Sequence, residues 1–269
     1  MIEFEIVARG LYQPAQLVID YDPTSQMPVT PEIQAWMDTL WQQKLTQAQQ
    51  RNTPLFETQL FRFVAASSQA DGTLHITMGA TSYKQYVTTR VPDFAQGRAR
   101  SELGNPLAVC SVVETSDGSI LLDKRQGVDV YVGRYHVIGG FFERHLDQVG
   151  SLPDPFGAVR REIREETGIQ SDDIRDQYCL GVVYDLQMPH GEMCFLTRLH
   201  IPLDEVLRRV PEEHEIKQLI PLHVTVDSLR KFVLKHHGNI SATGEPNLLM
   251  YGGWKFGGPW FEEVSALLR

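Results

Sequence analysis

The chain has 269 residues, of which 42% are hydrophobic and 22% are charged, and its formal net charge is −9. This composition is typical of a soluble globular protein with one large or two modest domains. The acidic balance argues against a general nucleic-acid binder, because such a protein needs a basic surface to contact phosphates.

Residues 1–104 mix helical and strand patterns and are expected to form a small N-terminal α+β domain. A Thr-Pro pair typical of a helix start precedes apolar residues at helical spacing, which predicts a helix over 30–50. Two strand-like segments, 56–65 and 74–78, flank an Asp-Gly turn. A Gly-Asn-Pro sequence at 104–106 then interrupts the pattern and marks the predicted boundary.

A second predicted domain covers residues 105–226 and begins with two strands. Segments 108–114 and 119–124 are apolar and flank a Ser-Asp-Gly turn, which is a strong hairpin signal. Further along, segments 180–186 and 194–201 have strand character as well. Two more elements are expected to complete the domain, a helix near 203–210 and a strand near 218–222.

Residues 161–169 read Arg-Glu-Ile-Arg-Glu-Glu-Thr-Gly-Ile and are the most informative segment of the chain. On a helix, positions i, i+3 and i+4 are neighbours, so Glu162, Glu165 and Glu166 project on one side and repel one another. A cation between them would remove this repulsion. Hard divalent cations such as Mg²⁺ suit that role, because they take oxygen ligands and bridge carboxylates to phosphates. The alternative is a solvated helix face, since Glu and Arg favour helices.

The residues around this segment predict where its helix begins and ends. Asp154 followed by Pro155 is the pattern of an N-cap and a first helical residue. Gly168 lies where the end of a helix favours a left-handed residue. Arg161 precedes Glu165 by four positions, so we expect the guanidinium to hold that carboxylate in place.

Residues 161–169 resemble the second half of the Nudix box, G-x5-E-x7-R-E-U-x-E-E-x-G-U, in which U is a bulky aliphatic residue, and match it at every specified position. Residues 137–143, Val-Ile-Gly-Gly-Phe-Phe-Glu, resemble the strand and Gly-Gly loop that open the box. The resemblance to the Nudix hydrolase superfamily implies an α/β (α+β) fold, namely an α/β/α sandwich with a mixed sheet after the small N-terminal domain. Residues 227–269 are expected to form a C-terminal helix and a Gly- and aromatic-rich tail that packs on this sandwich.

The chain departs from the box between its two halves. The family places its Gly fourteen positions before the Arg, whereas Gly140 lies twenty-one before Arg161, so about seven extra residues lengthen the loop. The first Glu of the box would fall at Pro153. The outer metal ligand is therefore left open between Glu143 and Asp154.

The N-terminal part resembles one Nudix branch, whose members hydrolyse UDP-glucose and UDP-galactose and also carry a long insertion in the box. The similar segments are 55–56, 61–62, 78–83 and 103–107. The resemblance extends over about residues 50 to 220. Within it, Tyr83 is a candidate substrate contact, and an ordinary strand-to-helix cap is the alternative reading of residues 81–83.

The chemistry implied by the resemblance is largely electrostatic. Water attacks one phosphorus of a diphosphate while the other phosphate leaves, and bound metal stabilises the developing charge and activates the water. Glu162, Glu165 and Glu166 are assigned to Mg²⁺, with Mn²⁺ as an alternative. Glu162 is also expected to orient or deprotonate the water, and Arg161 to support it.

Further site residues are predicted outside the helix. In the family an acidic residue after the box often serves as base or extra ligand; Glu215 is the first choice and Glu213 the second, and a solvated acidic loop is the alternative. Arg125 ends a strand and could contact phosphate, while Tyr131 and Tyr135 could stack on a base or sugar, although buried aromatics are commoner. The predicted substrate contacts are Arg125, Gly139, Gly140, Tyr83 and Tyr135.

The sequence therefore predicts a Mg²⁺-dependent Nudix hydrolase that converts UDP-glucose or UDP-galactose to UMP and sugar 1-phosphate. Within enzymes the alternative is an ADP-ribose or other nucleoside-diphosphate pyrophosphatase. From another class, the alternative is a non-catalytic Nudix-like sensor of a nucleotide sugar. The expected partner is a nucleotide-sugar substrate, without nucleic acid or membrane, and homodimer formation is left open.

The cytoplasm is the expected compartment. No apolar run approaches the roughly 20 residues of a membrane helix. Residues 1–10 lack the basic and apolar regions of a signal peptide. Cys110, Cys179 and Cys194 are odd in number and lack metal-ligand spacing, so buried, reduced thiols are expected.

Overall fold

The structure is a computed structural model that describes residues 2–51, 55–126, 130–212 and 219–269. A mixed sheet lies at its centre and consists of β1 (Phe4–Tyr12), β5 (Leu107–Glu114), β6 (Ser119–Lys124), β7 (Tyr135–His136), β8 (Ile138–Phe141), β11 (Ile174–Asp185), β12 (His190–Leu199) and β13 (Leu219–His223). The order is β1-β11-β12-β5-β6-β13, with β7 paired to β6 and β8 paired to β5. Only β12 and β5 run parallel among these described strands.

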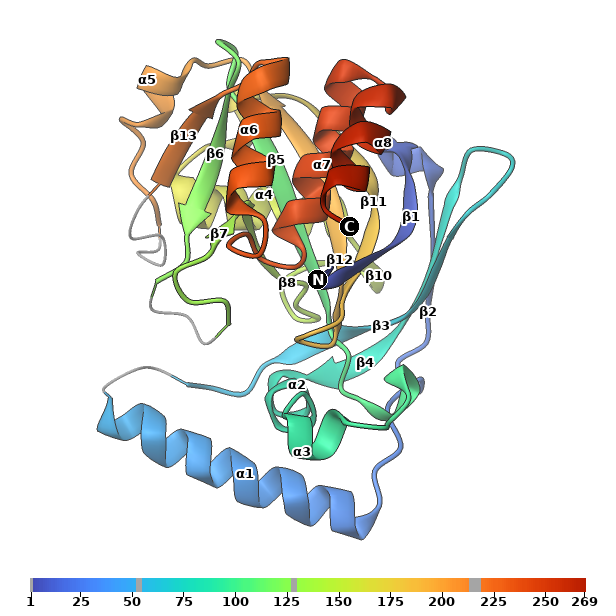
Figure 1. Cartoon of the computed structure of the whole chain (residues 1–269). Coiled ribbons are helices and arrows are strands. Elements are labelled where there is room, and N and C mark those ends of the chain that lie inside the picture. The colour runs from blue at the N-terminus through green and yellow to red at the C-terminus, as the bar shows by residue number, and fades with distance from the viewer. Residues whose placement is uncertain (1, 52–54, 127–129, 213–218) are drawn as a thin grey trace.

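Helices cover both faces of this sheet (Figure 1). One face packs against α4 (Pro155–Thr167), and the other against α6 (Val226–His236), α7 (Gly244–Phe256) and α8 (Gly258–Leu267). The side chains of β5 show which helices cover which face of the sheet, because successive side chains of a strand point to opposite sides. Val109 lies in the core with α4, whereas Cys110 lies in the core with α6, α7 and α8. Every residue of β5 is buried, as expected for a strand covered on both faces.

A second, three-stranded sheet lies beside the main one, with the order β2-β4-β3. Its elements are β2 (Leu17–Tyr21), β3 (Gln59–Ser68) and β4 (Leu74–Ser82), accompanied by α1 (Pro31–Gln50), α2 (Tyr83–Thr89) and α3 (Pro92–Ala95). Figure 1 shows α1 on the outer side of α2 and α3, away from the main sheet. Thr30 caps α1 by accepting a hydrogen bond from the N–H of Ile33, which confirms the helix start predicted from the Thr-Pro pair.

The small sheet shares a hydrophobic core with α4 and the main sheet. Phe61 and Met78 belong to the same buried cluster as Phe156 of α4. The ring of Phe61 lies 4.3 Å from that of Phe142, and the N–H of Phe61 donates to the carbonyl of Phe142 at 3.0 Å. Apolar burial is the main stabilising contribution to folding, so one core of this kind couples the stability of the two sheets.

The predicted α/β fold with a mixed sheet between helical layers is confirmed. The division at residue 104 stays a prediction, and β1 adds one observation to it: although it precedes residue 104, it pairs with β11 of the main sheet. The predicted helix near 203–210 is the short α5 (Leu203–Val206). Residue 218, the start of the last predicted strand, lies outside the described residues, and β13 follows it.

The Gly- and aromatic-rich segment near the C-terminus forms two helices packed against each other. A Cβ on Gly252 would lie 2.0 Å from the ring of Trp260, so the missing side chain lets α7 and α8 approach closely. Gly252 therefore serves helix packing, whereas Gly257, which lies between the two helices, has a φ of 95°, a conformation that favours glycine and lets the chain turn from α7 into α8.

Two further observations concern membrane-spanning helices and the three cysteines. Within the described part of the chain, no helix has the length and apolar character needed to cross a membrane. The three cysteines are buried, as predicted, and the Sγ atoms of Cys110 and Cys194 lie 3.9 Å apart.

Candidate active site

The acidic helix α4 begins and ends as its sequence predicts. Asp154 is the N-cap, and its Oδ1 accepts a hydrogen bond from the N–H of Gly157 at 2.9 Å. Pro155 is the first helical residue, where its missing N–H costs nothing. Gly168 adopts a left-handed conformation with φ of 74°, and its N–H donates to the carbonyl of Arg164 at 2.8 Å.

Helix α4 buries one side in the core and keeps its carboxylates along an adjacent side. Phe156, Val159 and Ile163 are buried beneath the sheet. The side chain of Glu162 is only 12% exposed and that of Glu165 is 18% exposed. The three glutamates therefore lie between core and solvent, where charges are costly unless they are paired.

Arg161 connects the carboxylates. Its Nη1 lies 2.9 Å from Oε1 of Glu162 and 2.9 Å from Oε2 of Glu165, which confirms the predicted Arg161–Glu165 pair. Its Nε and Nη2 each donate to one oxygen of Asp147 at 2.8 Å. Nη2 also donates to the carbonyl of Phe141 at 3.1 Å. Because Glu162 and Glu165 contact the same nitrogen, their oxygens are close neighbours.

The Gly-Gly loop of β8 lies directly against these carboxylates. The N–H of Gly139 donates to Oε2 of Glu166 at 3.1 Å. A Cβ on Gly140 would lie 2.6 Å from the carboxylate of Glu162, so the bare α-carbon leaves room for that group. A Cβ on Gly139 would instead meet the backbone oxygen of Val109 at 2.2 Å. The two glycines therefore differ: Gly140 makes space for the site, and Gly139 makes space for β5.

The electrostatics of the site leave Glu162 short of positive charge. Burial raises the pKa of Glu162 to about 8, Arg161 acts in the opposite direction, and the charges of Glu165 and Asp147 raise it further. A carboxylate ordinarily titrates far below neutral pH. Glu162 thus holds a proton near neutrality unless another cation is close by.

The two candidates for an outer metal ligand have other partners. Thr58 donates from its Oγ1 to Oε2 of Glu143 at 2.5 Å, and Nδ1 of His145 lies 3.6 Å from the same oxygen. Asp154 caps α4, with Arg160 at 3.8 Å from its second oxygen. The structure thus engages Glu143 with the N-terminal region and Asp154 with the helix start, and the choice between them stays open.

A divalent cation fits the donor chemistry of this site. Carboxylate oxygens are the ligands that Mg²⁺ prefers, and the raised pKa of Glu162 marks a buried charge that a cation would relieve. Across the described ranges, however, no group of three or more His, Cys, Asp and Glu side chains already converges on one point. The donors are present, and Arg161 lies among them.

Tyr83 is the one predicted aromatic contact that the structure brings to the Gly-Gly loop. Its ring lies 5.6 Å from that of Phe141, the residue after Gly140. Tyr135 packs instead against Phe232 and His236 of α6, with ring centroids 5.1 and 4.8 Å away.

Two other predicted residues are engaged elsewhere. Arg125 donates from its Nε to the carbonyl of Val130 at 3.1 Å, and Tyr131 donates to both carboxylate oxygens of Asp185 at 2.9 and 2.7 Å. Roles for Arg125 and Tyr131 in substrate binding stay predictions.

The predicted base lies in a segment that the structure does not describe. Glu215 and Glu213 both fall outside the described residues. The residue before them, Glu212, accepts a hydrogen bond from Nε of Arg164 on α4 at 3.0 Å. A Cβ on Gly168 would lie 2.4 Å from the carbonyl oxygen of Val210, so the acidic segment starts against the end of α4.

Sequence reasoning missed Asp147. This residue lies in the insertion between the two halves of the box, and its side chain is 2% exposed. The fixed spacing of the box points to Pro153 and so passes over it. A search of the whole insertion for a carboxylate that could pair with Arg161 would have included Asp147.

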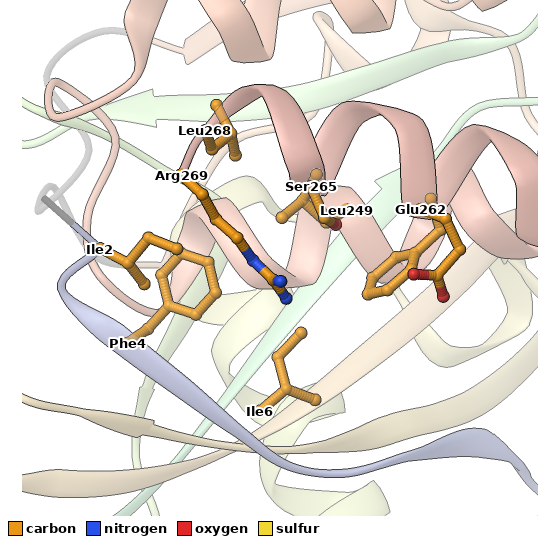
Figure 2. Close-up of a pocket in the computed structure, with 9 residues that line it drawn as sticks. Ile2, Phe4, Ile6, Leu249, Glu262, Ser265, Leu268 and Arg269 are labelled. Atoms are coloured by element: carbon orange, nitrogen blue, oxygen red, sulfur yellow. The ribbon is translucent and has the colours of Figure 1, made fainter.

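Two apolar hollows lie on the surface, and neither is lined by the α4 glutamates. One of about 270 Å³ lies between β1 and α8, lined by Phe4, Ile6 and Leu268 among others, with Arg269 reaching across it (Figure 2). It belongs to the face of the sheet opposite α4. The other, of about 280 Å³, is lined by β2 and by residues 152–156 at the start of α4.

Comparisons with known proteins give structural matches alone. No protein-family model matches the chain, and no curated protein matches it. Among solved structures, a MutT/nudix family protein from Enterococcus faecalis is 18% identical, with 44% of this chain and 43% of that chain covered and a TM-score of 0.34. A bifunctional NMN adenylyltransferase/ADP ribose pyrophosphatase from Francisella tularensis is 14% identical, with 57% and 42% covered and a TM-score of 0.40.

A third match is the NUDIX domain of Shewanella oneidensis NrtR complexed with ADP ribose, which is 16% identical, with 47% and 77% covered and a TM-score of 0.35. The matched regions span less than half of each of the first two structures. Likenesses at these TM-scores do not indicate an activity. The function proposed for this chain therefore rests on its own residues.

Proposed function

We propose that the chain is a divalent-metal-dependent hydrolase of the Nudix superfamily that cleaves the diphosphate of a nucleotide sugar. The preferred substrate is UDP-glucose or UDP-galactose, and the products are UMP and sugar 1-phosphate. The observation that carries this proposal is the contact between the two halves of the box. Despite the insertion between them, Gly140 lies against the carboxylate of Glu162, and Gly139 binds Glu166 through its N–H.

Glu162, Glu165 and Glu166 would hold the cation. When bound, Mg²⁺ supplies charge stabilisation at the diphosphate and activation of water. Arg161 keeps Glu162 and Glu165 together by contacting both through Nη1 at 2.9 Å. The N–H of Gly139 fixes the orientation of Glu166.

Glu162 is also suited to proton transfer. The oxygen of water forms a bond to one phosphorus, the bond from that phosphorus to the bridging oxygen breaks, and the other phosphate leaves with the bridging oxygen. The proton of the water passes to the carboxylate. A base works best with a pKa near the operating pH, and the burial of Glu162 moves its pKa in that direction.

The N-terminal region supports the nucleotide-sugar branch through Tyr83. Its ring meets Phe141 next to the Gly-Gly loop, so residues of the small sheet and its helices border the site. An ADP-ribose or other nucleoside-diphosphate pyrophosphatase would use the same helix and differ in its base pocket. The fold alone does not separate these substrates.

One observation favours a non-catalytic sensor of a nucleotide sugar. Within the described residues the carboxylates are held by Arg161 and no ready-made cluster of metal ligands is present. A domain that only binds its ligand has no need of such a cluster. Binding of a UDP-sugar without metal and without turnover would decide for this function.

The test is product analysis of the purified protein with Mg²⁺ against UDP-sugars, ADP-ribose, ADP-glucose and nucleoside triphosphates. We expect UMP and sugar 1-phosphate from UDP-sugars, and loss of turnover by orders of magnitude in Glu165→Gln with the fold intact. Glu205→Gln, on the short helix α5 and with its side chain 42% exposed, is the matched control and should behave as wild type. Turnover confined to ADP-ribose would contradict the proposed UDP-sugar substrate. Unchanged turnover in Glu165→Gln would contradict the proposed metal site.

A further inference from the structure

Asp147 organises the insertion that separates the two halves of the box. Its N–H donates to the carbonyl of Glu143 at 2.9 Å, and the N–H of Glu143 donates back to Oδ2 of Asp147 at 2.8 Å. Its own carbonyl accepts from the N–H of Asp154, the N-cap of α4, at 2.9 Å. Asp147 therefore joins the end of β8 to the beginning of α4.

The side chain of Asp147 fixes the plane of the Arg161 guanidinium. Its two oxygens accept from Nε and Nη2 of Arg161, each at 2.8 Å. A bidentate pair of this kind sets the orientation of the planar group as well as its position. With Nε and Nη2 held in this way, Nη1 is the nitrogen that faces Glu162 and Glu165.

The positive charge of the Arg161 guanidinium is stabilised by its surroundings. Burial works against the guanidinium, but the hydrogen bonds to Asp147 and the charges of Glu162 and Glu165 outweigh it and raise the pKa of Arg161. The side chain of Asp147 is 2% exposed, so water does not compete for the pair. A nearly dry ion pair with two good hydrogen bonds is a rigid one.

The residues beside Asp147 cannot take over this contact. Pro153, where the spacing of the box expects a glutamate, has no side-chain acceptor and lies in β10 (Leu152–Pro153), paired with β9 (Gln148–Val149). Asp154 caps α4, and Glu143 binds Thr58. The insertion thus supplies Arg161 with a carboxylate partner at a position that the spacing of the box does not specify.

We propose that Asp147 is the positioning residue of the carboxylate site: it orients Arg161, and through Arg161 it holds Glu162 and Glu165. This inference rests on the proposed hydrolase function. Asp147 does not touch the substrate in this scheme. It acts on the reaction only through the guanidinium, and that dependence is what an experiment can detect.

The experiment is a double-mutant cycle on Asp147→Asn and Arg161→Lys, read out as kcat and KM for UDP-glucose with Mg²⁺. Each single variant is expected to lower kcat roughly 10- to 100-fold, the usual effect of losing a residue that orients metal ligands, with KM nearly unchanged. The double variant should be no worse than the less active single variant, because both changes remove the same contact. Asp147→Glu should recover part of the lost kcat. Leu146→Ala, at the exposed neighbouring position, is the control for disturbance of the loop and should retain wild-type kcat.

A second measurement needs neither metal nor substrate. The Nε–Hε resonance of Arg161 in metal-free wild-type protein should exchange slowly with water, because the hydrogen is held by Asp147, and it should be lost in Asp147→Asn. Additive losses of kcat in the cycle would overturn the proposal, as would wild-type kcat in Asp147→Asn.

If the wild-type protein turned over no substrate in the panel, the proposed function would be wrong. The Nε–Hε resonance of Arg161 would then be the test of whether Asp147 positions Arg161. A signal unchanged in Asp147→Asn would then overturn the inference, and its loss would support it.

Discussion

Two buried glutamates lie on opposite faces of the main sheet, and their surroundings differ. Glu162 on α4 shares a single guanidinium with other carboxylates, and burial raises its pKa to about 8. Glu192 on β12 lies between His190, at 3.3 Å, and His136, at 3.7 Å, near the start of α7. Burial raises the pKa of Glu192 as well, but the hydrogen bond from His190 and the other interactions with the two histidines and Thr243 together outweigh it and lower the pKa to about 2.

The difference separates a charge that the protein compensates from one that it compensates only in part. Glu192 is fully compensated by the protein itself, since the pKa of His190 is raised by its carboxylate partners despite burial. Glu162 is compensated only in part, because Arg161 also pairs with Glu165 and Asp147, so it remains available to a proton or a cation. Ionisable groups with strongly perturbed pKa values cluster at functional sites, which supports the proposed role of Glu162.

The largest effect is expected from removing the charge of Glu162. Glu162→Gln keeps the size of the side chain and should lower kcat for the nucleotide sugar on the order of 10³-fold, within the usual range for general acid–base groups, because both the proposed ligand and base are lost. Steady-state kinetics with Mg²⁺ measure this. A change of less than about threefold in kcat would show that Glu162 takes no part in the chemistry.

Glu192→Ala should lower stability and leave kcat unchanged, in contrast to Glu162→Gln. It removes the carboxylate that lies 3.3 Å from the buried His190 and leaves that ring only Asp185, at 3.8 Å, and breaking a buried pair costs about 3–5 kcal/mol of stability. Urea unfolding gives that loss, and kcat per folded molecule should stay at the wild-type value. If kcat fell as far as in Glu162→Gln with stability unchanged, the two glutamates would not differ in the way described.

The pH dependence of stability should separate the two groups in metal-free protein. Glu162 has a folded-state pKa raised above its unfolded value, so its contribution is fully present below about pH 4.5 and is lost as the pH rises through about 8. Glu162→Gln lacks this titration, and its stability relative to wild type should increase by a few kcal/mol between pH 5 and 9.

For Glu192, whose folded-state pKa is depressed, the contribution is present above about pH 4.5 and is lost as the pH falls through about 2. Urea midpoints in EDTA across pH 2 to 9 give both curves. Added Mg²⁺ should flatten the dependence due to Glu162 and leave that of Glu192 as it was. A flat curve for wild type between pH 5 and 9 in EDTA would contradict the raised pKa.

The smallest effect is expected from a single methyl group at Gly140. A Cβ there would lie 2.6 Å from the carboxylate of Glu162, so Gly140→Ala should displace that group and lower kcat about tenfold, with most of the stability retained. Gly139→Ala is the matched comparison, because its Cβ would meet backbone at 2.2 Å and should destabilise the fold instead. Thermal unfolding and kcat for both variants distinguish the two outcomes.

The parts of the fold and of the candidate site that could be predicted from the sequence depend on contacts between residues close together in the chain. Asp154, Pro155 and Gly168 fix the bounds of α4 through contacts within a few residues, and Arg161 meets Glu165 one turn away. Such contacts depend on helix geometry alone and can be read from spacing.

The remaining parts depend on contacts that span long stretches of chain. Asp147 reaches Arg161 only because the insertion folds back, and no spacing rule describes an insertion. The pairing of β1 with β11 joins residues more than 150 positions apart, and the role of Gly252 becomes clear only beside Trp260. The placement of Tyr135 against α6 is of the same kind, because it is set by tertiary packing.

The position of β1 has a consequence for how the chain can be divided. The polypeptide contributes β1 to the edge of the main sheet, leaves to build the small sheet, and returns through β5 to the middle of the main sheet. A shortened chain that began at residue 105 would uncover the edge of β11, whose residues 180–183 are buried. Unpaired apolar edges are templates for aggregation. The N-terminal region thus leaves the main sheet after β1 and returns to it at β5, and we expect a chain trimmed to residue 105 to aggregate through the uncovered edge of β11.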